Sequence, residues 1–146
     1  MIADDLPIVG SLLVQTFDSS GLLKEERSIP NLVVTSGLNL IATGLASGTL
    51  TVPSHMAVGT SSTSAALSQT TLGTEVGRVA LTSTTRTGSA VAYVGTYPAG
   101  TGTGALTEAG IFNDPTTGTM LSRSTFSVVN KLADDSMVIT WTITIG

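Results

Sequence analysis

Apolar and polar residues alternate strictly near the end of the printed sequence. Met137, Ile139, Trp141, Ile143 and Ile145 take every second position, and Thr140, Thr142 and Thr144 lie between them. Successive side chains of a β-strand point to opposite faces, so this pattern predicts a strand with one face in a core. We therefore expect Ile139, Trp141 and Ile143 to be core residues.

Shorter apolar runs, separated by turn residues, predict further strands. They span residues 12–17, 22–28, 55–59, 75–85, 89–97, 106–113 and 120–129, with turn signals at 18–21, 86–88 and 114–118. Phe112 and Phe126 fall in the last two runs and are predicted core residues. Strands at this spacing predict a mainly β protein, built as an antiparallel β-sandwich or a jelly-roll-like barrel.

One segment has helical periodicity. Leu38, Ile41, Ala42 and Leu45 follow one another at helical spacing, which predicts one short amphipathic helix over about 36–47 that packs against the sheet. Thr35 or Ser36 is the expected N-cap, and Gly48 the expected stop.

The predicted organisation is an N-terminal arm and hairpin over 1–30, followed by a compact β domain over 31–146. Lys24, Glu25, Glu26 and Arg27 stand in succession, which predicts an exposed or edge strand. The arm contains the apolar residues Leu6, Ile8, Val9, Leu12 and Leu13. We expect these residues to contact a neighbouring copy or another protein by added-strand pairing, although packing on their own domain is an equal alternative.

Charge is scarce in this chain. Only 11% of the residues are charged, and the formal net charge is -4. Six scattered Lys and Arg residues cannot form the basic face that nucleic-acid binding needs. No apolar run approaches the roughly 18 residues of a membrane helix. The surplus of uncharged surface instead indicates interfaces between subunits.

Residues suited to catalysis are few. His55 is the sole histidine and follows Ser54, so a nucleophilic site could be imagined with Asp114 or Glu108, but an incidental role is strongly favoured. Glu108 is expected to pair with Arg123 across the 106–129 hairpin. The chain has no cysteine, and we predict no catalytic, cofactor or metal site.

Two other features have a functional and a structural interpretation. Asp134 and Asp135 are expected to make hydrogen bonds within a turn rather than to bind calcium. Trp141, Tyr93 and Tyr97 could form a carbohydrate platform, but we expect them in the core.

Acidic residues stand at the start, where a secretion signal would be basic, so export by that route is not expected.

Six blocks along the chain, in this order, resemble a family of small virion structural proteins of tailed bacteriophages. They read Asn31-Leu-Val-Val-Thr-Ser-Gly-Leu-Asn39, Ser54-His-Met-Ala-Val-Gly-Thr60, Leu72-Gly-Thr-Glu-Val-Gly-Arg-Val-Ala80, Leu106-Thr-Glu-Ala-Gly-Ile-Phe-Asn113, Gly118-Thr-Met-Leu-Ser-Arg-Ser-Thr-Phe126 and Asp135-Ser-Met-Val-Ile-Thr-Trp-Thr-Ile-Thr-Ile145. The resemblance covers about residues 20–146, and looser forms of Thr-Glu-Ala-Gly-Ile-Phe recur in tail-fibre and baseplate proteins.

The resemblance implies a non-enzymatic virion component, assembled in the host cytoplasm, whose partners are the major capsid protein and other copies of itself. The short chain and the lack of a long repetitive shaft favour a capsid decoration (cement) protein, bound to the head as a homotrimer. A tail adaptor, baseplate or fibre-base subunit is the first alternative. A carbohydrate-binding module or small hydrolase is the second.

Overall fold

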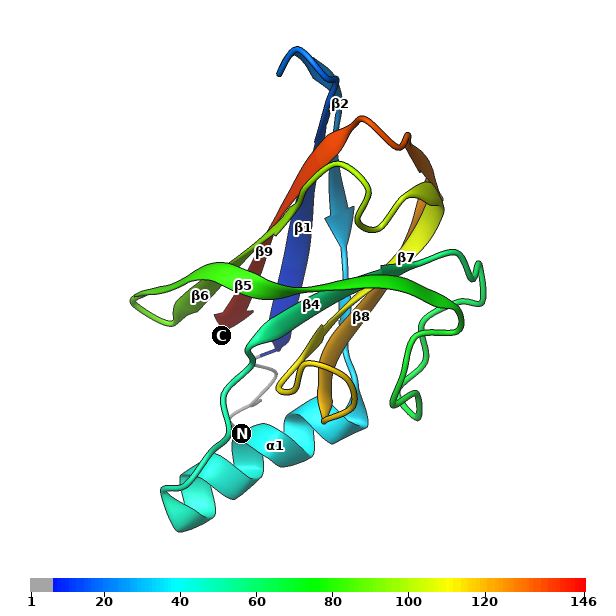
Figure 1. Cartoon of the computed structure of the whole chain (residues 1–146). Coiled ribbons are helices and arrows are strands. Elements are labelled where there is room, and N and C mark those ends of the chain that lie inside the picture. Colours follow the sequence, from blue (N-terminus) through cyan, green and yellow to red (C-terminus); the bar gives the residue numbers. More distant parts are fainter. Residues whose placement is uncertain (1–6) are drawn as a thin grey trace.

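The computed structural model describes residues 7–146, and their strands form a single nine-stranded sheet. The elements are β1 (Ile8–Phe17), β2 (Leu23–Pro30), β3 (Leu32–Val33), α1 (Thr35–Ser47), β4 (His55–Gly59), β5 (Glu75–Thr87), β6 (Ala90–Tyr97), β7 (Gly104–Phe112), β8 (Met120–Lys131) and β9 (Ser136–Ile145). All paired strands run antiparallel. The prediction of a mainly β, antiparallel fold is confirmed, and the arrangement is a nearly closed barrel (Figure 1).

The barrel nearly closes because its two outermost strands are consecutive along the chain. The strand order is β2-β1-β9-β6-β5-β4-β7-β8-β3, so β2 and β3 are the two edges of the sheet. The chain pairs with β1 as far as Pro30 and with β8 from Leu32 onward, with Asn31 between them. On the opposite wall, the long strand β5 pairs first with β4 and then with β6.

Arg27 ties the edge strand β2 to β8. Its guanidinium donates to the backbone oxygens of Ser127 and Val128, each at 2.5 Å. These acceptors lie where the pairing of β7 with β8 shifts register, which leaves backbone groups without a strand partner. The charged run was predicted at an exposed or edge strand, and β2 is indeed at the edge, where Arg27 helps to close the wall.

The core is a set of inward-facing side chains from all parts of the barrel. In one cross-strand row, Trp141 on β9 lies opposite Tyr93 on β6 and Leu12 on β1, and Leu12 lies opposite Ile29 on β2. Trp141 and Ile139 are fully buried, and Ile143 and Phe112 are nearly so. Phe126, expected in the core, is only partly buried, because the register shift in β8 follows directly after its neighbour Thr125.

The helix packs against the sheet, as expected, but at the β8 end of the barrel, where Ile41 contacts the core, rather than flat on one face. It lies across one open end of the barrel (Figure 1), and Gly37 is its only buried residue. A Cβ at Gly37 would lie 2.1 Å from the carbonyl oxygen of Leu121, so glycine allows the first turn to approach β8 closely. The N-cap is Val34 rather than Thr35 or Ser36, whereas Gly48 ends the helix in a left-handed conformation as predicted.

The predicted arm is largely part of the barrel. β1 lies between β2 and β9 and pairs along its whole length with β9. Leu12 is fully buried in the core, so it is not free to contact another chain, and Leu13 is half-buried. Leu6 lies outside the described residues. Of the expected contact residues in the described part, Ile8 and Val9 remain near the surface.

Candidate functional site

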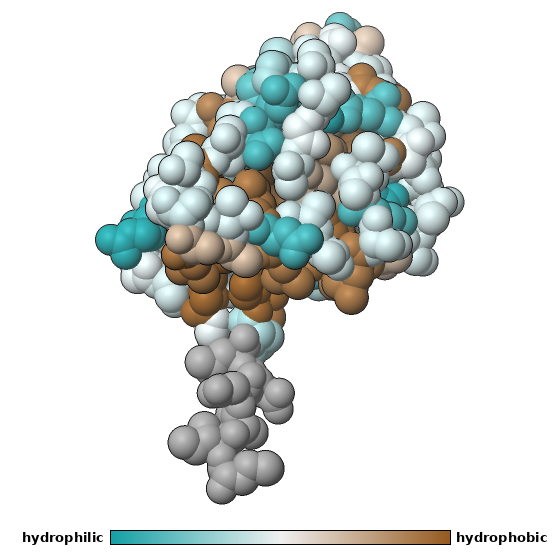
Figure 2. All heavy atoms as spheres, turned by 90° about the horizontal axis from the view of Figure 1, so that it is seen from below, coloured by the Kyte–Doolittle hydropathy of each residue, from teal (hydrophilic) through white to brown (hydrophobic). Residues whose placement is uncertain are grey.

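The most distinctive surface of the molecule is an apolar end of the barrel, formed where β1 begins, β9 ends and α1 crosses. Figure 2 shows hydrophobic side chains gathered in this view of the molecule from below. We define this apolar end by four large, exposed apolar residues. Their exposed fractions are 39% for Leu50, 40% for Leu38, 49% for Val9 and 51% for Ile145. Contiguous exposed apolar surface of this kind typically marks a contact with another protein.

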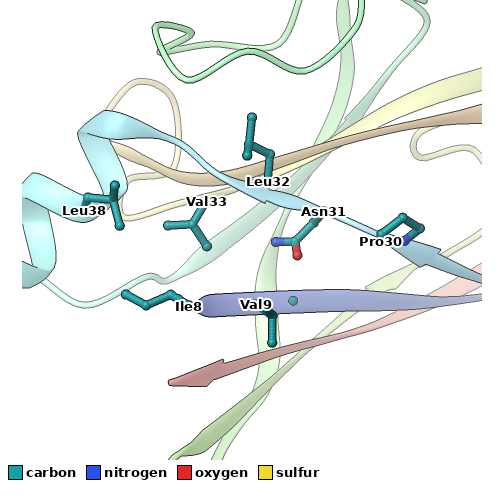
Figure 3. Close-up of a pocket in the computed structure, with 8 residues that line it drawn as sticks. Ile8, Val9, Pro30, Asn31, Leu32, Val33 and Leu38 are labelled. Carbon is teal, nitrogen blue, oxygen red and sulfur yellow. The ribbon is translucent and has the colours of Figure 1, made fainter. Parts of the chain in front are cut away.

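A groove of about 500 Å³ opens beside this end, between β1 and the segment that runs from β2 through β3 to α1. Its lining residues are Ile8, Val9, Gly10, Pro30, Asn31, Leu32, Val33 and Leu38. In Figure 3, Asn31 points from the upper segment toward β1, and Val33 and Leu38 lie on the side of Ile8. The side chain of Val9 points away, so its contribution to the groove is mainly backbone.

The groove exists because two paired segments separate. The amide of Asn31 donates to the carbonyl oxygen of Gly10 at 3.2 Å, which is the last backbone bond recorded between β1 and this segment. Continuing the same register would place Val33 opposite Ile8, but Leu32 and Val33 pair with β8 instead. Among the described residues, the first part of β1 therefore has a strand partner only on its β9 side.

A smaller hollow of about 90 Å³ lies between α1 and the barrel. It is lined by Leu40, Ile41, Leu50, Pro53, Val91, Tyr93, Leu121, Ile143 and Ile145. This apolar space shows that the helix covers the barrel end incompletely. The hollow is continuous with the apolar end, because Leu50 and Ile145 belong to the hollow and to the apolar end alike.

A second notable cluster is the buried ion pair of Glu108 on β7 and Arg123 on β8. Arg123 Nη2 lies 2.9 Å from Glu108 Oε1, and both side chains are almost completely buried. The same carboxylate accepts hydrogen bonds from the amides of Ser61, Gly73 and Thr74 at 3.0, 2.8 and 2.8 Å. The pairing expected between Glu108 and Arg123 is confirmed.

This cluster fastens a long loop rather than forming an open site. Arg123 also donates to the backbone oxygen of Thr63 and to the side chain of Gln69, both at 2.9 Å. Burial alone would raise the pKa of Glu108. Four hydrogen bonds to the carboxylate outweigh burial and lower the pKa: those from the amides of Thr74 and Gly73, from the guanidinium of Arg123 and from the amide of Ser61. The carboxylate stays ionised and holds residues 60–74 on the barrel.

Ser54 and His55 do contact each other, but the two carboxylates considered as partners are engaged elsewhere. The hydroxyl of Ser54 lies 2.8 Å from Nδ1 of His55. Glu108 is committed to Arg123 and the loop, as described above. Asp114 accepts from the amides of Thr116 and Thr117 in its own turn, and these hydrogen bonds, with that of Thr117 largest, lower its pKa to about 2.

The aromatic residues do not form an exposed platform. Trp141 and Tyr97 are fully buried and Tyr93 is nearly so. The hydroxyl of Tyr97 donates to the backbone oxygen of Met56 at 2.8 Å, and burial, its largest cause, raises the pKa of Tyr97 well above its usual range. These three side chains are structural, as the sequence favoured.

Asp135 makes turn contacts, as expected, and also an ion pair that the sequence did not predict. Its carboxylate accepts from the amide of Leu132 at 2.9 Å and from Lys24 Nζ at 2.6 Å. The Lys24 hydrogen bond is the main cause of its lowered pKa.

Across residues 7–146, no three His, Asp or Glu side chains gather in a way that could hold a metal ion.

Arg78 is a further structural residue that the sequence gave no signal for. Its guanidinium lies over the ring of Phe112, 3.9 Å from the centroid, and donates to the backbone oxygens of Asp114 and Thr117 at 2.9 Å. It thereby holds the β7–β8 turn.

In the part of the chain that the structure describes, there is no helix with the length and apolar character to cross a membrane.

Comparisons with known proteins add no assignment. No family model, curated protein or solved structure matches the chain. The phage family expected from the sequence blocks therefore stays a prediction.

Sequence reasoning found part of the apolar end and the groove, because Ile8 and Val9 are among the expected contact residues, but it missed the part that α1 contributes. The apolar stripe of the helix predicts burial, whereas Leu38 and Leu45 are exposed. Apart from the apolar residues of β1, the only available signal was the charge-poor composition, which indicated interfaces without locating them. The groove depends on where β2 ends and β3 begins, and that switch of partners is a property of the tertiary structure.

Proposed function

We propose that this chain is a structural protein of a tailed-bacteriophage virion, a capsid decoration (cement) protein that binds the head surface as a homotrimer. The single observation that carries the proposal is the apolar end, which presents Val9, Leu38, Leu50 and Ile145 on a small barrel with few charges. Such a surface suits a lasting contact with another protein.

The sequence blocks that resemble phage virion proteins support the same proposal, because they meet in the framework of the barrel. The block over 106–113 forms nearly all of β7 and supplies Glu108. The block over 72–80 supplies the amides of Gly73 and Thr74 that bind this carboxylate, and the block over 118–126 supplies Arg123. Distant blocks thus depend on one another, which is the pattern expected if they specify a common scaffold.

A nearly closed barrel with a fastened loop is well suited to a passive clamp. Its core needs no rearrangement on binding, so little ordering cost is set against the contacts made. A homotrimer would offer three apolar ends to a threefold site of a capsid lattice. Each contact could be weak, because three linked contacts act together through their effective concentration.

The decisive experiment is to locate and count the protein in purified particles of the phage that encodes it. Quantitative mass spectrometry should give hundreds of copies per particle, and cryo-electron microscopy should place them on the head. A handful of copies at the tail would support the alternative of an adaptor, baseplate or fibre-base subunit. Absence from purified particles would refute the virion proposal.

A binding assay can then test the apolar end directly. Heads that lack the protein are incubated with purified variants, and bound protein is measured after sedimentation. Val9→Asp should bind poorly, because a charge would be desolvated in the contact. Val76→Asp is the matched control, since Val76 is similarly exposed (41% against 49% for Val9) but lies on β5. Equal binding of the two variants would exclude the apolar end as the contact.

A further inference from the structure

The second half of β5 has one unpaired edge. β5 pairs through its first half with β4 and through its second half with β6, and these two strands lie on opposite sides of β5 in the sheet. On the β4 side, the amide of Leu81 still donates to the carbonyl oxygen of Ser54. Pro53, which precedes Ser54, has no N–H group to continue the ladder. Residues 82–87 therefore have no strand partner on this side among the described residues.

This edge is exposed and firmly held. All six residues from Thr82 to Thr87 are exposed, and the β5–β6 hairpin extends to one side of the barrel (Figure 1). β6 pairs on its far side with β9, so the hairpin is anchored in the sheet. The backbone is thus already in the extended form that an added strand needs, and little ordering cost would be set against the new hydrogen bonds.

Charged side chains line the other long free edge of the sheet but are scarce on this one. β2 carries four charged residues in succession, and charges on an edge strand prevent pairing with other chains. Residues 82–87 read Thr-Ser-Thr-Thr-Arg-Thr, so they combine one charge with four β-branched threonines that suit a strand. The guanidinium of Arg86 donates to the carbonyl oxygen of Gly88 at 3.0 Å, which holds this side chain toward its own turn.

We infer that this edge pairs with the same edge of a second copy of the chain, antiparallel and around a twofold axis. Side chains that lie opposite each other in a sheet share a face, so an axis normal to the sheet places one residue opposite itself. With Thr84 or Thr85 at the centre, Arg86 lies opposite Thr82 or Thr84 of the second copy. Arg86 then does not meet its own counterpart, and a destabilising pair of like charges is avoided.

A second copy meets the requirements that this edge sets for a partner. The partner must offer an exposed, unpaired strand of similar length with little charge, and residues 82–87 are themselves such a strand. Pairing by β-augmentation would join two sheets in the order β9-β6-β5-β5-β6-β9, and a self-complementary contact of this kind closes with two copies. In a homotrimer, the same contact would join neighbouring trimers.

The inference goes beyond the proposed function and does not depend on it. None of the four residues that define the apolar end belongs to residues 82–87. Binding to heads is tested through Val9, on β1, whereas pairing of copies is tested on β5. Failure of one proposal therefore leaves the other standing.

The chain has no cysteine, so a single introduced thiol can report the pairing. Thr84→Cys and Thr85→Cys are prepared separately, checked for native circular dichroism and oxidised in a glutathione buffer. Directly opposite residues of an antiparallel pair have Cα atoms about 4.5–5.5 Å apart, a distance that a disulfide can span. The variant whose cysteine lies at the twofold axis should form a disulfide-linked dimer, which a non-reducing gel detects.

Two controls separate this pairing from random collisions. Ser11→Cys is also at an exposed position, but both edges of β1 are occupied there, by β2 and β9. Thr82→Cys lies on the same edge, but in either register the two copies of residue 82 are at least about 13 Å apart along the strands. At about 0.1 mM protein, a thiol held at millimolar effective concentration should cross-link about tenfold more than either control.

Cross-linking that is selective for Thr84→Cys or Thr85→Cys, or for both, would support the inference. Any other pattern would overturn it, including equal cross-linking of all four variants and the absence of dimers from both central variants.

Discussion

At the scale of single residues, the stability of this barrel depends on buried charges that are fully hydrogen-bonded. Glu108 combines three backbone amides with the guanidinium of Arg123. Removing one partner of such a pair costs about 3–5 kcal/mol, because the other charge stays buried without compensation. The pair also fixes residues 60–74, so its loss would be felt over a whole loop.

Glu108 should make the protein sensitive to acid. Its folded-state pKa is lowered, so its contribution to stability is complete above the unfolded pKa of about 4.3 and is lost as the pH falls through the folded value. Urea unfolding followed between pH 6 and pH 3 should show a steeper loss for the native protein than for Glu108→Gln. Glu26→Gln, on the edge strand β2, is the control and should keep the native pH dependence. Identical slopes for Glu108→Gln and the native protein would contradict this assignment.

Trp141 should be among the most sensitive positions of the core. Replacing it with alanine leaves a large cavity in the row with Tyr93 and Leu12, and should cost about 3–5 kcal/mol of unfolding free energy. Circular dichroism is the suitable probe in urea, because the variant has no tryptophan to fluoresce. Leu45→Ala, at a position 84% exposed, should change stability by no more than about 0.5 kcal/mol. A near-native midpoint for Trp141→Ala would contradict the role given to this ring.

The sequence allowed part of this residue-level picture to be predicted. The alternation in β9 located Trp141, and an isolated glutamate in an uncharged strand suggested its pairing with Arg123. The partial exposure of Phe126 could not be predicted, because a register shift leaves no signature in the apolar pattern. The amides that bind Glu108 were also hidden, since any residue type can supply a backbone N–H group.

At the scale of elements, the first strand is more deeply integrated than its sequence suggested. β1 pairs with two strands and contributes Leu12 and Val14 to the core. Apolar residues near a chain end are equally compatible with an arm and with a core strand, so the pattern alone could not decide. The helix illustrates the converse problem, because its apolar stripe faces partly outward.

Two N-terminal deletions should separate the core strand from the segment before it. Deleting residues 1–13 removes more than half of β1, including the fully buried Leu12, and should abolish cooperative thermal unfolding. Deleting residues 1–6 leaves every strand of the described residues intact and should preserve the far-ultraviolet circular dichroism spectrum. Cooperative unfolding of the longer deletion would show that β1 is dispensable, in conflict with its place in the sheet.

At the scale of the whole molecule, the uneven surface is the main finding. Charges lie along β2, where Lys24 and Arg27 make specific contacts, whereas large apolar side chains collect at the end crossed by α1. Composition predicted that such surface would exist. Its position could be predicted only in part, at the start of β1, because it results from the meeting of β1, β9 and α1, which are far apart in sequence.

Association as the proposed homotrimer should make melting depend on protein concentration. An oligomer is stabilised by mass action, so a tenfold increase in concentration should raise the melting temperature by on the order of 2 °C. Differential scanning calorimetry over a hundredfold concentration range would measure this rise. A concentration-independent melting temperature for the intact chain would argue against a stable oligomer.

The pairing of Ile8 with Ile145 brings the beginning of β1 and the end of β9 together at the apolar end. The β1–β2 hairpin, with exposed Ser19 and Ser20 at its tip, extends from the other end of the barrel (Figure 1). A peptide fused to the C-terminus would therefore crowd the very surface proposed to grip a partner. For display of foreign epitopes on a particle, an insertion at that hairpin tip is the better design, because the cargo would project away from the attachment side.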